Sequence, residues 1–112
     1  DTGMPCIIVT HTGVKTGAIR KIPLMRVEVD GSYVLLGSMG GQPKNPDWVY
    51  NLRADPVVTI RDKTEVYAMR VREVSDDEER SKLWAAAATA YPPYDDYQAK
   101  TTRKITVFVA EV

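Results

Sequence analysis

A glycine-rich loop near the start of the sequence is surrounded by basic side chains. The loop, Thr12-Gly13-Val14-Lys15-Thr16-Gly17, is followed by Arg20 and Lys21, and no acidic residue occurs between Thr2 and Val27. Backbone N–H groups in such a loop can turn toward an anion, while lysine and arginine supply the opposite charge. The pattern is not a P-loop, which needs a glycine directly before its lysine. We interpret the loop as a candidate phosphate site; a solvated turn is the alternative.

A second candidate segment joins two glycines to the start of a helix. Ser38-Met39-Gly40-Gly41 is followed by Lys44-Asn45-Pro46-Asp47-Trp48. Paired glycines let a flat ligand approach the backbone closely, and a helix N-terminus favours a negatively charged group. An ordinary connection between a strand and a helix, with glycine for its positive φ, explains the same residues. The segment by itself leaves both interpretations open.

A set of tyrosines forms the third candidate. Tyr91, Tyr94 and Tyr97 follow one another at a spacing of three, and Pro92-Pro93 lies between the first two. They could line an aromatic pocket and offer hydroxyl groups, or they could simply pack at the end of a helix. The spacing is compatible with either role.

Composition narrows the classes of function. The 112 residues carry 15 basic and 15 acidic side chains, without the overall positive charge of duplex-binding proteins, so nucleic acid is not expected as a partner. A single cysteine and a single histidine exclude an internal disulfide and a Cys/His zinc set, so no metal is expected. Cys6 is expected to be a small core residue, and His11 has no carboxylate or nucleophile partner evident in the sequence.

The sequence shows no sign of a membrane-spanning segment. No apolar run approaches the roughly 18 to 20 residues that a spanning helix needs, and no signal peptide opens the chain. We therefore expect a cytoplasmic protein. The sequence begins at Asp1 rather than at a methionine, so we expect residues upstream of it.

The expected strands and helices group as hairpins rather than as alternating strand–helix units. Asp30-Gly31 is the strongest hairpin signal, because a type I′ turn needs positive φ at both central positions. Asn45 is expected to cap a short helix that ends before Pro56, and Ser75 to cap a longer one as the first residue of a capping box with Glu78. A short helical segment is expected over residues 94–101. Strands are expected over residues 6–10, 20–29, 32–38, 57–61, 64–74 and 105–112. Such a set predicts an α+β fold around an antiparallel sheet, and closure into a barrel would hide its edges.

Taken together, three segments resemble the deazaflavin-dependent nitroreductase family of actinobacteria: TGVKTGAIRKIPLMRVEVDG, GSMGGQPKNPDWVYNL and YPPYDDYQAKTTRKITVFV. They occur in the family's order and cover nearly the whole chain. The resemblance implies a single domain over residues 1–112, folded as a six-stranded antiparallel split β-barrel with two or three flanking helices, similar to flavin mononucleotide-binding split barrels. It also implies the deazaflavin coenzyme F-420, an 8-hydroxy-5-deazaflavin, as hydride donor.

The resemblance gives roles to the residues singled out above. The residues implied to hold the coenzyme's phosphate and its acidic oligoglutamate tail are Lys15, Thr16, Gly17, Arg20 and Lys21. The backbone implied to lie beside the deazaflavin ring is that of Ser38, Met39, Gly40 and Gly41, supported by Lys44, Asn45, Pro46, Trp48 and Asn51. The implied cofactor-binding set is completed by Pro23, Leu24 and Met25, and the implied catalytic residues are Ser38, Tyr91, Tyr94 and Tyr97.

Two departures from the family pattern concern the acceptor. Met25 stands where some relatives carry an aromatic residue facing the substrate, and Met39 where some carry a lysine beside the cofactor. Both make bicyclic nitroimidazoles poorer candidates as substrates. The amphipathic N-terminal segment of relatives, which favours membranes, is also absent from this sequence, so peripheral membrane association is expected only through residues upstream of Asp1.

The function implied is that of an oxidoreductase. It would transfer a hydride from reduced F-420 to a quinone, a nitro compound or another conjugated acceptor. The alternatives are a non-catalytic carrier of the coenzyme or of an apolar ligand, and a flavin mononucleotide-dependent reductase on the same fold.

Overall fold

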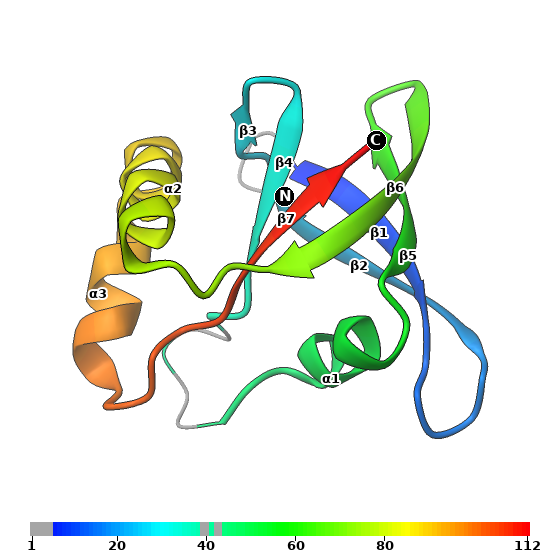
Figure 1. Ribbon diagram of the computed structural model, residues 1–112, viewed down its shortest axis with the longest axis horizontal. Coiled ribbons are helices and arrows are strands. Elements are labelled where there is room, and N and C mark those ends of the chain that lie inside the picture. Colours follow the sequence, from blue (N-terminus) through cyan, green and yellow to red (C-terminus); the bar gives the residue numbers. More distant parts are fainter. Residues whose placement is uncertain (1–5, 39–40, 42–43) are drawn as a thin grey trace.

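The computed structural model of the protein describes residues 6–38, 41 and 44–112. The described residues form one antiparallel sheet of seven strands, in the order β2-β1-β5-β6-β7-β4-β3, with three helices beside it (Figure 1). The strands are β1 (Cys6–Thr12), β2 (Ile19–Met25), β3 (Glu28–Val29), β4 (Ser32–Leu36), β5 (Val57–Asp62), β6 (Glu65–Glu73) and β7 (Val107–Glu111). The helices are α1 (Asp47–Ala54), α2 (Asp77–Ala90) and α3 (Pro93–Lys100).

The sheet curls so that its two edge strands are consecutive in the chain. β2 and β3 stand at opposite ends of the strand order, and Arg26 and Val27 connect them directly. The Val27 carbonyl accepts a hydrogen bond of 2.8 Å from the Val34 N–H, which ties this connection to β4. The predicted α+β split barrel is therefore confirmed.

The strand count is seven instead of the predicted six because the strand expected over residues 20–29 is interrupted. Pairing with β1 ends at Met25, and pairing with β4 begins at Glu28. Between them the Arg26 side chain turns to Asp62, with 2.8 Å between its Nε and the carboxylate. The chain thus leaves one edge of the sheet and joins the other.

Alternation along β4 and β7 sends their side chains into two separate cores. Tyr33, Leu35 and Phe108 pack on the side of α1, with Trp48 and Leu52. The alternate residues pack under α2 and α3: Val34, Leu36, Val107 and Val109. Figure 1 shows α2 and α3 together on one side of the sheet, with α1 apart from them. A ligand site can therefore use α1 and the α2–α3 pair as two different walls.

The predicted hairpin turn is confirmed, but the strands that it joins differ from the prediction. Asp30 and Gly31 both have positive φ, 52° and 84°. The turn connects β4 with the short strand β3, whose pairing covers only Ser32 and Tyr33, and the other edge of β4 pairs with β7. The pairing of β4 with β7 joins residues about seventy positions apart, so no local pattern could reveal it.

Two helix caps and one cysteine also differ from expectation. The N-cap of α1 is Pro46, without a side-chain hydrogen bond, instead of Asn45. The N-cap of α2 is Asp76, whose carboxylate accepts a hydrogen bond of 2.8 Å from the Glu79 N–H, one residue later than the box predicted from Ser75. Cys6 is exposed, because it begins β1 on the face opposite to the buried residues. None of the described helices is long and apolar enough to cross a membrane.

Candidate functional site

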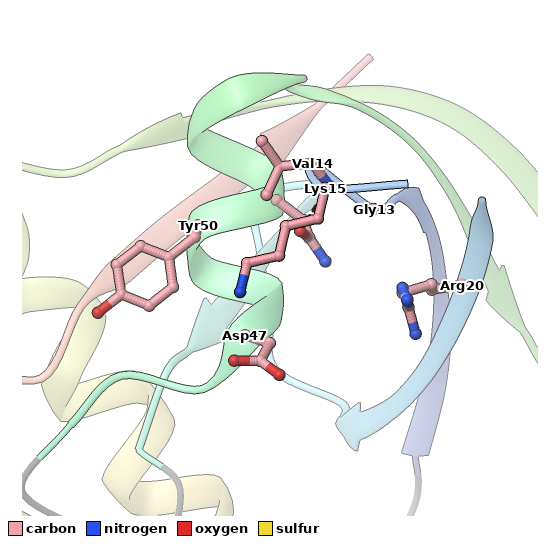
Figure 2. Close-up of a pocket in the computed structure, with 7 residues that line it drawn as sticks. Gly13, Val14, Lys15, Arg20, Asp47 and Tyr50 are labelled. Atoms are coloured by element: carbon pink, nitrogen blue, oxygen red, sulfur yellow. Dashed lines mark hydrogen bonds between the residues drawn. The ribbon is translucent and has the colours of Figure 1, made fainter. Parts of the chain in front are cut away.

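A pocket of about 290 Å³ lies between the basic loop and α1 (Figure 2). Its lining consists of Gly13, Val14, Lys15, Arg20, Asp47, Tyr50 and Asn51. Lys15, Arg20 and Asn51 belong to the site residues expected from the sequence, whereas the lining roles of Asp47 and Tyr50 were not foreseen. The structure therefore brings the first candidate segment together with the helix of the second.

Glycines and one buried amide shape the basic loop. The Gly13 N–H donates to the Ala18 carbonyl and the Gly17 N–H donates to the Gly13 carbonyl, each over 2.8 Å. Gly17 has a φ of 73°, which a residue with a Cβ rarely adopts. From α1, the Asn51 side chain accepts a hydrogen bond of 2.9 Å from the Val14 N–H. The loop is thereby closed on itself and attached to the helix.

The two strand cations expected at the site lie on opposite faces of β2. Arg20 shares a face with Ile22 and Leu24, which pack on the core under α1, and it lines the pocket. A Cβ on Gly13 would lie 2.8 Å from the Arg20 Nε, so a larger residue there would displace the arginine side chain. Lys21 has the opposite orientation and does not line this pocket. The remaining loop residues of the expected set, Thr16 and Gly17, are exposed and are also not in its lining.

An arginine that sequence reasoning missed holds the second candidate segment. The Nη2 of Arg103 donates hydrogen bonds of 3.0 Å to the carbonyls of Gly37 and Ser38. Its Nη1 donates a hydrogen bond of 2.9 Å to Oδ1 of Asn45, and burial lowers the pKa of this guanidinium. Arg103 thus joins the end of β4 to the residues that precede α1. No motif in the sequence marks it, because its partners lie 58 to 66 residues away.

The same segment passes close to α3. Gly41 has a φ of 82°, and its N–H donates to the Ser38 carbonyl over 2.9 Å. A Cβ at Gly41 would lie 2.7 Å from the Tyr97 carbonyl oxygen, so no larger residue fits without a shift of the helix. Lys44 is exposed, whereas Trp48 is buried against Phe108 and acts through packing. Met39 and Gly40 lie outside the described residues.

The three predicted tyrosines form one cluster at the junction of α2 and α3. The ring centroids of Tyr91 and Tyr94 are 5.0 Å apart, and that of Tyr97 is 6.2 Å from each. The hydroxyls of Tyr91 and Tyr97 share a hydrogen bond of 3.1 Å, which is the main reason that the pKa of Tyr91 is raised. Tyr94 is only 5% exposed, and burial raises its pKa to about 12. Tyr91 and Tyr97 therefore carry the accessible hydroxyl pair, and Tyr94 packs beneath it.

Met25 lies on the side of the tyrosines. It is partly buried against the core that includes Tyr94, and it pairs with Cys6 on β1. Leu24 points to the other core, and Pro23 is exposed. Of the three β2 residues expected to contact the cofactor, Met25 is thus the one placed beside the expected acceptor side.

His11 is buried beside the basic loop. It is 4% exposed, shares a face of β1 with Ile7 and Val9, and its Nδ1 finds no hydrogen-bond partner among the described residues. Burial lowers the pKa of His11, and the nearby Arg20 charge acts in the same direction. The imidazole is therefore neutral at physiological pH. No group of three or more His, Cys, Asp or Glu in the described part of the chain is placed to hold a metal ion.

Residues 2–112 match the family model described as F420H(2)-dependent quinone reductase. The chain belongs to this family. It is 30% identical over 107 residues to a quinone reductase of this kind from Mycobacterium tuberculosis, and the alignment covers 94% of this chain and 72% of the relative.

Two solved structures are similar to the chain over almost its whole length. One is an F420-H2-dependent reductase, with 44% sequence identity and a TM-score of 0.89, covering 96% of this chain and 94% of the other. A second, described as a domain-swapped dimer, has 45% identity and a TM-score of 0.90 and covers 96% and 80% of the two chains. Family membership confirms an oxidoreductase with coenzyme F-420 as its cofactor, and the family's acceptor is a quinone.

Proposed function

We propose that this chain reduces a quinone with reduced coenzyme F-420, held between the Lys15–Arg20 pocket and the Tyr91–Tyr97 pair. The observation that carries the proposal is the placement of the described residues between β4 and α1. Ser38 follows β4, Gly41 lies against α3 at Tyr97, and Asn45 precedes α1, where the basic pocket lies. The anionic end of a long coenzyme would lie in the basic pocket beside α1, and its flat ring would lie toward α3.

The pocket fits the anionic part of the coenzyme. Lys15 and Arg20 line it from the loop and from β2, and Figure 2 shows both side chains beside the same hollow. No ion pair with either cation occurs among the described residues, so both charges are available to a phosphate or a carboxylate. Lys21, on the other face of β2, would act only at longer range, on the acidic tail.

We assign Ser38, Gly41 and Asn45 to the wall beside the ring. Arg103 fixes the Ser38 carbonyl and the Asn45 side chain, and at Gly41 the absence of a side chain lets α3 pack against the backbone. We place the ring against the backbone at Ser38, whose carbonyl Arg103 holds in position. Because Arg103 already holds Ser38 and Asn45 in place, binding the ring there costs less conformational entropy.

The tyrosine pair fits the acceptor. When bound, the coenzyme supplies the hydride, and the quinone oxygen that gains negative charge needs a donor. Tyr91 and Tyr97 have two hydroxyl protons but share only one hydrogen bond, so one O–H is left to donate to that oxygen. The raised pKa of Tyr91 keeps its proton in place at neutral pH.

Met25 favours a quinone over a nitro compound as acceptor. Its side chain is flexible and apolar and has no hydrogen to donate, so it accommodates a planar ring without anchoring a nitro group. We therefore rank nitro compounds as secondary acceptors. Tyr94, buried beneath the pair, supports the acceptor wall by packing.

The test is a titration with F-420 followed by tryptophan fluorescence, combined with oxidation of the reduced coenzyme by menadione. The double variant Lys15→Ala, Arg20→Ala should bind F-420 more weakly, and the parent's affinity should fall with salt, because exposed ion pairs are screened within about 8 Å at physiological ionic strength. The control is Lys82→Ala, Arg70→Ala, which removes the same net charge from exposed positions outside the pocket lining. Equal affinity of parent and pocket variant across the salt series would place the phosphate elsewhere.

A further inference from the structure

One carboxylate lies in the pocket that the basic side chains dominate. Asp47 belongs to the lining, and Figure 2 shows its carboxylate facing the same hollow as the Lys15 ammonium, with Arg20 across from it. The described residues contain no ion pair between Asp47 and either cation. No salt bridge therefore neutralises the Asp47 carboxylate, and an anion bound in the pocket would face its charge.

The charge of Asp47 acts on two neighbours, the N-terminus of α1 and the pocket. Asp47 is in the first turn of α1, where a negative charge is favourable and where Pro46 supplies no side-chain cap, and the same residue lines the pocket. An anion site built for maximal attraction would carry a neutral residue here. The placement of Asp47 inside the pocket therefore has a consequence for what the pocket accepts.

We propose that Asp47 is a specificity residue that favours a singly charged phosphodiester over a doubly charged phosphate monoester. This inference rests on the proposed function, which puts the coenzyme's phosphate in this pocket. The lining has two cations and one carboxylate, a net charge of one positive unit, which a phosphodiester balances when the tail carboxylates lie outside the pocket, toward Lys21. A phosphate monoester carries about 1.5 to 2 negative charges at pH 7, so its additional charge meets Asp47 without a matching cation.

A preference for phosphodiesters would distinguish two cofactors that split barrels bind, F-420 and flavin mononucleotide. Coenzyme F-420 joins its ring part to its tail through a phosphodiester, whereas flavin mononucleotide ends in a phosphate monoester. Two unit charges about 4 Å apart in a water-like dielectric repel each other enough to change an affinity about fivefold. Asp47 should therefore disfavour flavin mononucleotide by about that factor relative to F-420.

The test compares affinities for F-420 and flavin mononucleotide in the parent and in Asp47→Asn, by tryptophan fluorescence at pH 8 and physiological ionic strength. We expect the preference for F-420 to shrink about fivefold in Asp47→Asn. At pH 5 the monoester approaches a single charge, because its second pKa is near 6, so the effect of the substitution on flavin mononucleotide should fade. The control Glu78→Gln removes an exposed carboxylate from the first turn of α2 and should leave the preference unchanged.

Two results would overturn the inference, and both are distinguishable from failure of the proposed function. One is an equal change of both affinities in Asp47→Asn; the other is no change at all, with the thermal melt showing a folded variant. If Lys15→Ala, Arg20→Ala weakens F-420 binding in the same experiment, the pocket is still the phosphate site and only the role of Asp47 is wrong. If that double variant also binds normally, the proposed placement of the coenzyme fails first.

Discussion

The backbone N–H of Val14 donates a hydrogen bond of 2.9 Å to Oδ1 of Asn51, across 37 positions of sequence. This hydrogen bond fixes the backbone next to Lys15, which follows Val14 in an exposed loop, and so it positions the Lys15 side chain. The helix that carries Asn51 also carries Asp47 and Tyr50, so one hydrogen bond connects the loop wall of the pocket with its helix wall.

Asn51→Ala should weaken F-420 binding about fivefold, because a net contribution of about 1 kcal/mol is typical of one such hydrogen bond. The fold should survive, since Val14 is exposed and its N–H can bond to water once the amide is gone. Fluorescence titration gives the affinity, and amide hydrogen exchange at Val14 reports the loop itself. Faster exchange at Val14 with unchanged affinity would show that the loop position does not matter for binding.

Arg103→Lys should weaken the attachment of Gly37 and Ser38 to Asn45. A lysine is a point charge and cannot reproduce a planar fork that reaches three oxygen acceptors. We expect a loss of about 1 to 3 kcal/mol in the free energy of unfolding and a larger KM for the reduced coenzyme. Thermal melts and steady-state kinetics check the two effects.

The matched control is Arg72→Lys. Arg72 makes three side-chain hydrogen bonds, to Glu79 and Glu111, but on an exposed part of the sheet. Such surface pairs contribute at most about 1 kcal/mol, so this variant should keep its KM and most of its stability. An equal rise of KM in both variants would remove Arg103 from its positioning role.

The features of this fold that the sequence could predict are local. The turn at Asp30-Gly31 follows from the φ values that the two residues accept, and the clustering of Lys15 and Arg20 around a glycine loop is visible within nine positions. Both are properties of neighbouring residues, and the resemblance to a known family added the coenzyme. The tyrosine cluster likewise follows from a short spacing.

The features that the sequence could not predict depend on distant partners. Arg103 acts through residues about sixty positions away, and the charge of Asp47 matters only because α1 folds against the basic loop. Lys21 could not be separated from Arg20 without knowing which face of β2 is covered. The burial of His11 could not be predicted, because the sequence does not show which face of β1 is covered by α1.

His11 should make the protein less stable as the pH falls through about 6.5. Burial lowers the pKa of the folded imidazole, so the unfolded chain takes up a proton at a pH where the folded chain does not. The stability that the neutral imidazole contributes is therefore complete above the ordinary histidine pKa of about 6.5, decreases below it, and stops decreasing once folded His11 is protonated as well. The loss amounts to about 1.4 kcal/mol for each unit by which the pKa is lowered.

The chain has one histidine, so this pH window can be assigned to a single side chain. Denaturant melts between pH 7.5 and 5.5 give the free energy of unfolding, and the single imidazole resonance gives its pKa directly. The slope should disappear in His11→Phe. A parent-like slope in that variant, or a folded pKa at or above 6.5, would contradict the assignment.

Met25→Tyr should move specificity toward nitro compounds. The new hydroxyl would stand beside the tyrosine pair and supply the donor that methionine lacks, an effect of about 1 kcal/mol or fivefold. We expect the parent to prefer menadione over a bicyclic nitroimidazole and the variant to narrow the ratio of the two kcat/KM values. Met25→Leu, which keeps an apolar side chain, should leave the ratio unchanged. If the ratio of the two kcat/KM values is the same in the parent and in Met25→Tyr, Met25 does not contact the acceptor.

Replacing the hydroxyls of Tyr91 and Tyr97 should lower kcat for the quinone. Removal of one donor that stabilises developing charge in a water-excluded site commonly costs about 100-fold in kcat or more. The two hydroxyls share one hydrogen bond, so either single Tyr→Phe variant leaves one O–H in place, and the full loss should appear only in the double variant. Tyr94→Phe is the control, because its ring packs beneath the pair and its buried hydroxyl keeps its proton with a pKa of about 12.

The decisive comparison is kcat at saturating reduced coenzyme for the two single variants, the double variant and Tyr94→Phe. A donor role predicts a double-variant loss larger than the product of the two single losses, since each hydroxyl substitutes for the other. Stacking alone predicts that all four proteins keep their kcat, because phenylalanine preserves the rings and their edge-on contacts. Binding of F-420, followed separately by fluorescence, should stay unchanged in every case if the pair acts on the acceptor and not on the coenzyme.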